Sequence, residues 1–146
     1  MNSWRKGVRK QRVNRIVLDS SAVLAMLLNE PGGERMESLL DALGREARFQ
    51  VAISSVNWCE ILTRMQREQV GMSSERLSTV LGGVDFYPFG KADAEAAADY
   101  ALVNQALSFG DRACLSLAKS LFATAWTTER LWARCALDVP VELIRP

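Results

Sequence analysis

The chain has 146 residues, of which 49% are hydrophobic and 24% are charged, with a formal net charge of +1; this predicts one globular domain that buries a core without disulfides or structural metal. No apolar run approaches the roughly 20 residues of a membrane span and the N-terminus lacks the apolar core of a secretory signal, so we expect a soluble, cytoplasmic protein with no membrane partner. The absence of histidine excludes Ser-His-Asp and Cys-His triads and every histidine-bound metal site.

Positive charge is concentrated at the start of the chain, where residues 1–15 contain no acid. The basic residues of this segment are Arg5, Lys6, Arg9, Lys10, Arg12 and Arg15. The rest of the chain has twelve basic and seventeen acidic residues. We therefore predict a flexible basic arm over residues 1–14 and a folded domain over residues 15–146. Such an arm often binds nucleic acid or an acidic partner, and the alternative is a disordered leader.

Short apolar runs then alternate with amphipathic segments. The apolar runs predict strands at residues 15–18, 51–53, 84–88, 123–127 and 141–144. Helical spacing predicts helices at residues 20–28, 34–43, 55–70, 74–81, 93–103, 110–122 and 129–135. Serines available as N-caps are Ser20 or Ser21, Ser54 or Ser55, and Ser73 or Ser74. This alternation predicts an α/β fold with a mostly parallel sheet of four to five strands, covered on both faces.

Four acidic residues follow predicted strands or lie near the start of a helix. Asp19 follows the first strand, Glu60 lies about one and a half turns into the next long helix, Asp111 opens a helix, and Glu129 follows the fourth strand. Because ligands gather at the carboxyl ends of parallel strands, these residues can converge on one edge. Each also has a local explanation, as a helix cap for Asp19 and Asp111, a solvated helix residue for Glu60, and an ordinary helix N-terminal acid for Glu129.

Carboxylates that crowd together raise one another's pKa, and a divalent cation removes this conflict. Oxygen ligands without nitrogen or sulfur favour Mg²⁺ or Mn²⁺ over zinc. One or two such ions can activate water and stabilise charge on a phosphodiester without a histidine base. Arg112 and Arg130 flank the acids and are candidates for phosphate contacts. The alternatives are ion pairs with the acidic cluster or a solvated position.

The three cysteines are odd in number and widely spaced, which argues against a disulfide framework and a zinc site. Each of Cys59, Cys114 and Cys135 lies beside apolar residues in a helix-like stretch. We therefore expect three buried thiols.

Four segments, one around each acidic residue, resemble the PIN-domain family, especially the VapC-type toxins of VapBC toxin–antitoxin pairs. They are VLDSSA at residues 17–22, ISSVNWCE at 53–60, LSFGDRAC at 107–114 and WTTERLW at 126–132. They occur in the family's order, and the resemblance covers about residues 15–145. It implies a three-layer α/β/α PIN-like fold with a parallel central sheet.

The resemblance also implies a site and an activity. Asp19, Glu60 and Asp111 match the family's acidic triad, and Glu129 stands where the family usually has aspartate. The hydroxyl positions that often line this pocket are matched by Ser21 and Thr127. The implied activity is Mg²⁺- or Mn²⁺-dependent hydrolysis of RNA. Asp19 and Asp111 are expected to be the main metal ligands, with Glu60 as a ligand or water-orienting group and Glu129 at a second metal position.

We therefore predict an endoribonuclease toxin with an RNA substrate, a cognate antitoxin and a homodimeric state. Possible partner contacts, for which core packing is the alternative, are Trp58, Met65 and Trp132. Two other classes compete with this interpretation. A phosphatase of the haloacid dehalogenase type needs a second aspartate where Ser21 stands, and a non-catalytic RNA- or protein-binding module on the same fold accommodates the glutamate at position 129.

Overall fold

The computed structural model describes residues 13–145, so residues 1–12 of the predicted basic arm lie outside the described part. The strands are β1 (Asn14–Leu18), β2 (Phe49–Ser54), β3 (Asp85–Tyr87), β4 (Thr124–Thr127) and β5 (Val141–Leu143). The helices are α2 (Ser20–Leu27), α3 (Gly33–Arg45), α4 (Ser55–Arg67), α5 (Ser74–Val80), α6 (Lys91–Tyr100), α7 (Phe109–Ser120) and the 3₁₀ helix η1 (Arg130–Arg134). None of the helices within residues 13–145 has the length and apolar character that a bilayer crossing requires.

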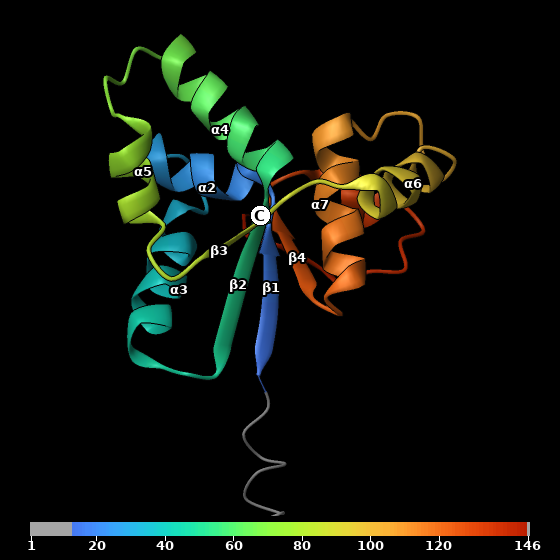
Figure 1. Cartoon of the computed structure of the whole chain (residues 1–146), viewed down its shortest axis with the longest axis horizontal. Coiled ribbons are helices and arrows are strands. Elements are labelled where there is room, and N and C mark those ends of the chain that lie inside the picture. The colour runs from blue at the N-terminus through green and yellow to red at the C-terminus, as the bar shows by residue number, and fades with distance from the viewer. Residues whose placement is uncertain (1–12, 146) are drawn as a thin grey trace, which may run out of the picture.

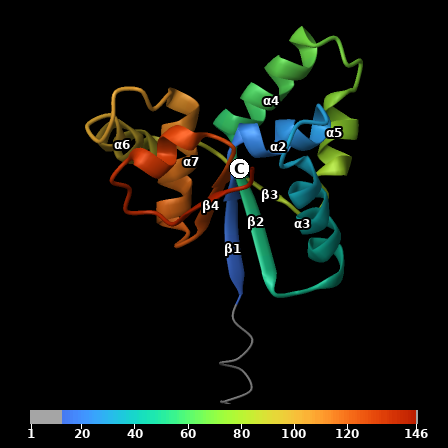
Figure 2. The same ribbon diagram turned by 180° about the vertical axis from the view of Figure 1, so that it is seen from behind.

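The strands form one sheet in the order β3-β2-β1-β4-β5, and every neighbouring pair is parallel. Figure 1, and Figure 2 from behind, show α2 to α5 on one side of the sheet and α6 and α7 on the other. The predicted three-layer α/β fold with a parallel sheet of up to five strands is therefore confirmed. Because the strands are parallel, all their carboxyl ends lie at one edge, where β2, β1 and β4 are neighbours.

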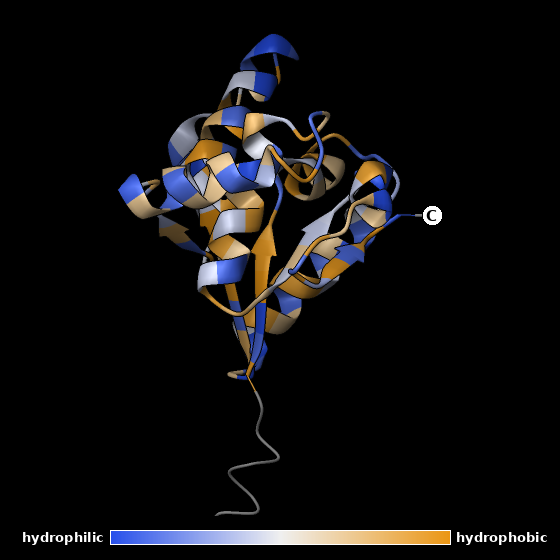
Figure 3. Cartoon of the chain, turned by 90° about the vertical axis from the view of Figure 1, so that its right-hand side faces the viewer, coloured by the Kyte–Doolittle hydropathy of each residue, from blue (hydrophilic) through white to orange (hydrophobic). Residues whose placement is uncertain are grey.

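The core lies in two layers because successive side chains of a strand point to opposite faces. From β1, Ile16 and Leu18 pack with the layer of α2 to α5, whereas Val17 packs with Leu115 on the α7 side. Figure 3 shows the corresponding pattern of largely hydrophobic strands beneath helices that carry both hydrophobic and hydrophilic residues. Helices on both faces therefore fix β1 at the centre of the molecule.

Two of the three possible partner contacts belong to this core. Met65 packs in the layer of α2 to α5 and Trp132 in the layer of α6 and α7, and both are buried. Trp58 is half-buried and makes an edge-to-face contact with Phe86, at 5.1 Å between ring centroids. Met65 and Trp132 are therefore core residues, which was the alternative to a role in partner contacts.

Several predicted helix limits are wrong. The helix predicted to reach residue 70 ends at Arg67, and Gln69 beyond it has a positive φ of 53°. The helix predicted over residues 93–103 begins at Lys91 and ends at Tyr100. Local backbone turns determine where these helices begin and end, and the spacing of apolar residues does not reveal such turns.

The predicted caps are right at two helices and wrong at one. The hydroxyls of Ser54 and Ser73 accept the backbone N–H groups of Val56 and Arg76. For α2, however, the N-cap is Asp19 rather than Ser20 or Ser21, and the Asp19 side chain makes no capping hydrogen bond. This leaves the Asp19 carboxylate available for contacts with other elements.

The prediction of three buried thiols is also wrong. Cys114 in α7 is fully buried, but Cys135 is half-buried and Cys59 is exposed. Cys59 precedes Glu60 on the face of α4 that lines a surface cavity, so the apolar residues around it in sequence pack on the other side of the helix.

Candidate functional site

Asp19, Glu60 and Asp111 belong to elements at the carboxyl edge of the sheet: Asp19 directly precedes α2, Glu60 lies in the second turn of α4 and Asp111 lies in the first turn of α7. Asp19 follows β1 directly, and its backbone N–H donates to Trp126 O of β4 at 2.9 Å. The charges of Asp111 and Glu60 both raise the pKa of the Asp19 carboxyl. The three acids therefore share one electrostatic environment.

Two hydroxyl groups hold the buried carboxylate of Asp19. Ser21 Oγ and Thr127 Oγ1 donate to Asp19 Oδ2 at 2.6 and 2.9 Å. Each hydroxyl also accepts a backbone N–H from the loop after β4, Ser21 from Thr128 at 3.0 Å and Thr127 from Glu129 at 3.0 Å. Because these N–H groups occupy acceptor positions on the hydroxyls, they favour hydroxyl protons directed at Asp19.

Burial raises the pKa of the Asp19 carboxyl from 3.8 to about 7. The hydroxyls of Ser21 and Thr127 act in the opposite direction because they bond the ionised form, whereas the charges of Asp111 and Glu60 add to the effect of burial. Asp19 is only 2% exposed, so water does little to stabilise its charge. A nearby cation would relieve this cost.

Asn57 and Ser20 position the carboxylate of Glu60. Ser20 Oγ and Asn57 Nδ2 donate to Glu60 Oε1 at 2.9 and 3.0 Å. The same Asn57 amide donates to Gly110 O at 3.0 Å, which ties α4 to the first turn of α7. A Cβ at Gly110 would overlap both carboxylate oxygens of Glu60, so this carboxylate occupies space that any other residue at position 110 would fill.

Asp111 is half-buried and has a second task in the first turn of α7. Its Oδ2 accepts the backbone N–H of Ser108 at 2.9 Å, and Ser108 Oγ accepts the N–H of Asp111 at 3.1 Å. This reciprocal pair is a capping box. Asp111 is therefore a helix cap, as one of the two sequence interpretations held, but the cap uses only one of its carboxylate oxygens.

Glu129 is exposed, unlike the other three acids. It precedes η1, and its side chain caps nothing. Together with Ser21 and Glu60 it lines a cavity of about 530 Å³ between α2, α4 and the loop after β4. Glu129 and Glu60 thus face the same cavity.

The predicted arginines occupy different surroundings. Arg112 Nη1 donates to Ala97 O of α6 at 3.1 Å, and its guanidinium lies 5.9 Å from the ring centroid of Phe109. Arg112 therefore connects α7 to α6, and its predicted phosphate contact stays a prediction. Arg130 lines a second cavity of about 590 Å³ that also includes Thr128 and Glu129.

Three positions that support the acids were not assigned to the site from the sequence. Ser20 and Asn57 hold Glu60, and Ser108 holds Asp111. Asn57 stands three residues before Glu60 and Ser108 three before Asp111, the spacings of a helical side-chain pair and of a capping box, so both were detectable. The bond from Ser20 depends on the tertiary fold.

The three carboxylates share a hydrogen-bonding pattern in which one oxygen of each group is held. Asp19 Oδ2, Glu60 Oε1 and Asp111 Oδ2 accept protein hydrogen bonds, and no donor within residues 13–145 bonds the other oxygen of each group. Only oxygen ligands are offered, which suits Mg²⁺ or Mn²⁺. Within the same residues no three Cys, Asp or Glu side chains are close enough to form a ready-made metal cage. Binding of a cation would therefore require the carboxylates to draw together.

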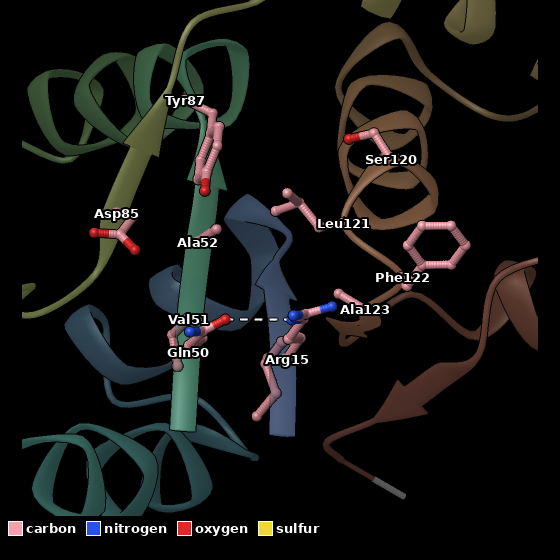
Figure 4. Close-up of a pocket in the computed structure, with 11 residues that line it drawn as sticks. Arg15, Gln50, Val51, Ala52, Asp85, Tyr87, Ser120, Leu121, Phe122 and Ala123 are labelled. Carbon is pink, nitrogen blue, oxygen red and sulfur yellow. Dashed lines mark hydrogen bonds between the residues drawn. The ribbon is translucent and has the colours of Figure 1, made fainter. Parts of the chain in front are cut away.

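A separate cavity of about 310 Å³ lies away from the acids, beside Arg15, Gln50 and the end of α7 at Ser120 (Figure 4). Arg15 Nε donates there to Gln50 Oε1 at 3.2 Å. Arg15 and Gln50 are paired near the amino ends of β1 and β2. This cavity is thus at the opposite end of the strands from Asp19.

Fold and site together define a small α/β domain with an acidic centre at the carboxyl edge of a five-stranded parallel sheet. The sequence model of the PIN domain matches residues 16–135, and the chain belongs to the PIN domain family. Members of this family are typically nucleases and generally bind divalent metal ions. A search among curated protein sequences found no match.

Solved structures with the same fold include several toxin–antitoxin complexes. A toxin–antitoxin complex from Klebsiella pneumoniae has a chain that is 14% identical, with a TM-score of 0.60 over 78% of this chain and 86% of that one. VapBC2 from Rickettsia felis, bound to a promoter DNA fragment, is 16% identical, with a TM-score of 0.59 over 88% of this chain and 97% of that one. FitAcB from Neisseria gonorrhoeae is 22% identical, with a TM-score of 0.59 over 86% of this chain and 95% of that one. At these identities the likeness is one of fold.

Proposed function

We propose that this PIN domain is a divalent-cation-dependent endoribonuclease that acts as the toxin of a toxin–antitoxin pair. The observation that carries the proposal is the arrangement of Asp19, Glu60 and Asp111. Each carboxylate is held through one oxygen and offers the other, and the ionised form of Asp19 is costly in the absence of a cation. This is the state expected of a site that needs Mg²⁺ or Mn²⁺.

The side chains divide the work of the proposed reaction. Asp19 and Asp111 are the main cation ligands, and Glu60 either ligates or orients the water that attacks the phosphodiester. Ser21 and Thr127 fix the direction of the Asp19 carboxylate, and Glu129 holds a second cation or an ordered water. The bound cation activates water and stabilises charge on the phosphate in hydrolysis of this kind.

The proposed role as a toxin is supported by the identity of the structures with the same fold. The Klebsiella pneumoniae structure is a toxin–antitoxin complex, and the Rickettsia felis VapBC2 structure contains promoter DNA. By analogy, we propose that this chain binds a cognate antitoxin, forms a homodimer and acts on RNA in the cytoplasm. Growth arrest on expression that disappears on Asp19→Asn substitution would support the toxin role.

The direct test is cleavage of total cellular RNA by purified protein with Mg²⁺ or Mn²⁺, compared with Asp111→Asn and Asp93→Asn variants. Asp93 is a matched control because its Oδ2 also accepts the backbone N–H three residues earlier, that of Gly90, in the first turn of α6. Asp111→Asn should lower the rate about 100-fold or more, since a group that acts on the reacting charge is lost. Asp93→Asn should cleave at the wild-type rate.

Three results would count against the proposal. Cleavage that persists in the presence of EDTA would contradict the cation dependence. Equal loss in the Asp111→Asn and Asp93→Asn variants would show that Asp111 acts only as a cap. Absence of both cleavage and cation binding in the wild-type protein would favour the non-catalytic binding module.

A further inference from the structure

Arginine side chains line the cavity beside Glu60. Arg64 and Arg67 of α4 face this cavity together with Arg145 from the C-terminal segment. Arg64 is four and Arg67 seven residues after Glu60, so the three side chains share one face of the helix. At 1.5 Å per residue, Arg67 lies about 10 Å along the helix axis from the acidic site.

The cavity beside Glu60 continues into the second cavity, past the loop after β4. The two share Thr128, Glu129 and Arg145, and the second one is also lined by Arg130 and Leu131. We call the joined cavities the arginine trough. Its lining holds Arg64, Arg67 and Arg145 together with Glu60, and Arg130 together with Glu129, so arginines accompany the acidic residues in both cavities.

Of the three arginines in the cavity beside Glu60, one forms an exposed ion pair and two form none among the described residues. Arg64 pairs with Glu68 at 2.9 Å, but both side chains are more than 40% exposed and such a pair is weak. Arg67 and Arg145 form no ion pair with any acid of residues 13–145. The trough is lined by four arginines and three glutamates, the latter being Glu30, Glu60 and Glu129. Residues 16–146 as a whole carry five more acidic than basic residues, so the trough is locally more favourable to a polyanion than the rest of the body.

We propose that Arg64, Arg67 and Arg145 bind the phosphates of a single RNA strand and lead it across the acidic site. This inference rests on the proposed function and identifies where its substrate lies. No aromatic side chain lines either cavity, so bases have no stacking platform there. Binding in the trough therefore depends on phosphates, with strong salt dependence and little base preference.

The test is the affinity of a short fluorescein-labelled single-stranded RNA, measured by fluorescence anisotropy in EDTA so that cation-dependent cleavage does not interfere. The Arg64→Ala/Arg67→Ala double variant and the Arg145→Ala variant are compared with Arg76→Ala. Arg76 is a matched control because it is exposed on α5, outside the trough, and also forms no ion pair with an acid of residues 13–145. Cleavage of total RNA with Mn²⁺ is measured in parallel.

The double variant should bind about tenfold more weakly at low salt, and its plot of log affinity against log salt should be shallower by about 1.4, the value for two lost phosphate contacts on a single strand. Arg145→Ala should also weaken binding, and Arg76→Ala should leave it unchanged. Wild-type affinity in the double variant would overturn the proposal. So would equally tight binding of polyglutamate with the same arginine dependence, because the trough would then fit an acidic protein.

The two proposals fail in different ways. If the wild-type protein binds RNA through these arginines but cleaves none with any cation, the nuclease is contradicted and the trough stands. If the protein cleaves RNA while the arginine variants bind as tightly as wild type, the trough is contradicted and the nuclease stands.

Discussion

The Asp19→Asn variant is expected to be more stable than the wild-type protein in the absence of metal at mildly alkaline pH, and to lose RNA cleavage. Burial raises the pKa of the Asp19 carboxyl from 3.8 to about 7, so ionisation of this group opposes folding. The difference corresponds to an unfolding free energy on the order of 4 kcal/mol. Asparagine carries no charge, and its carbonyl still accepts the hydroxyls of Ser21 and Thr127.

The pH window follows from the direction of the shift. Below about pH 4 the carboxyl is protonated in both folded and unfolded chains, so its full contribution to stability is present. As the pH rises, the unfolded chain ionises first and the folded protein loses stability until the pH passes about 7. The stability advantage of the Asp19→Asn variant is therefore absent in acid and constant above neutral pH.

Thermal unfolding in EDTA across this range measures the effect. The variant should unfold roughly 8–16 °C above the wild type at alkaline pH, for a chain of this size, whereas Mn²⁺-dependent cleavage should fall about 100-fold or more. Asp93→Asn, at a half-buried carboxylate outside the acidic site, is the control and should show no such gain. An Asp19→Asn variant that is less stable than wild type at alkaline pH without metal would contradict the conclusion that the ionised Asp19 carboxylate destabilises the metal-free protein.

The second large effect is expected from Gly110→Ala. A methyl group at position 110 would overlap both carboxylate oxygens of Glu60, and Glu60 would have to leave its bonds with Ser20 and Asn57. Cleavage should fall about 10- to 100-fold because a misplaced catalytic group is costly. Stability should change little, since the displaced atoms belong to the end of a flexible side chain and alanine favours a helix by up to about 1 kcal/mol.

Gly44→Ala is the matched control for this substitution. Gly44 also lies in a helix, α3, but a Cβ there meets no atom within 4 Å. This variant should retain wild-type cleavage. Wild-type cleavage by Gly110→Ala would show that the observed position of Glu60 is unimportant for activity. A large loss of stability in Gly110→Ala would show instead that the backbone, rather than Glu60, takes up the overlap.

The central strands β1 and β2 were predictable because most of their residues are buried. Residues 15–18 and 51–53 are almost wholly apolar, as expected of parallel strands covered on both faces, and both lie in the sheet. The position of Asp19 and Asp111 after β1 and at the start of α7 also followed from the sequence. The acids converge because the parallel sheet gathers its carboxyl ends at one edge, which is a property of the fold class.

Contacts between distant elements were not predictable from local spacing. Asp19 is the N-cap residue of α2, but its carboxylate bonds Thr127, which lies more than a hundred residues later, and makes no capping hydrogen bond. The exposure of Cys59 depends on which face of α4 packs against the core. The arginine trough joins α4 to the C-terminal segment, and only the folded chain brings Arg67 and Arg145 to one cavity.

The most direct test of the acidic centre is binding of Mn²⁺ to the purified protein, followed by electron paramagnetic resonance at mildly alkaline pH. Wild-type protein should bind Mn²⁺, the Asp19→Asn and Asp111→Asn variants should bind it at least about tenfold more weakly, and Asp93→Asn should match wild type. Mn²⁺ binding that is unchanged in both site variants, or absent from the wild-type protein, would contradict a cation centre built on these carboxylates.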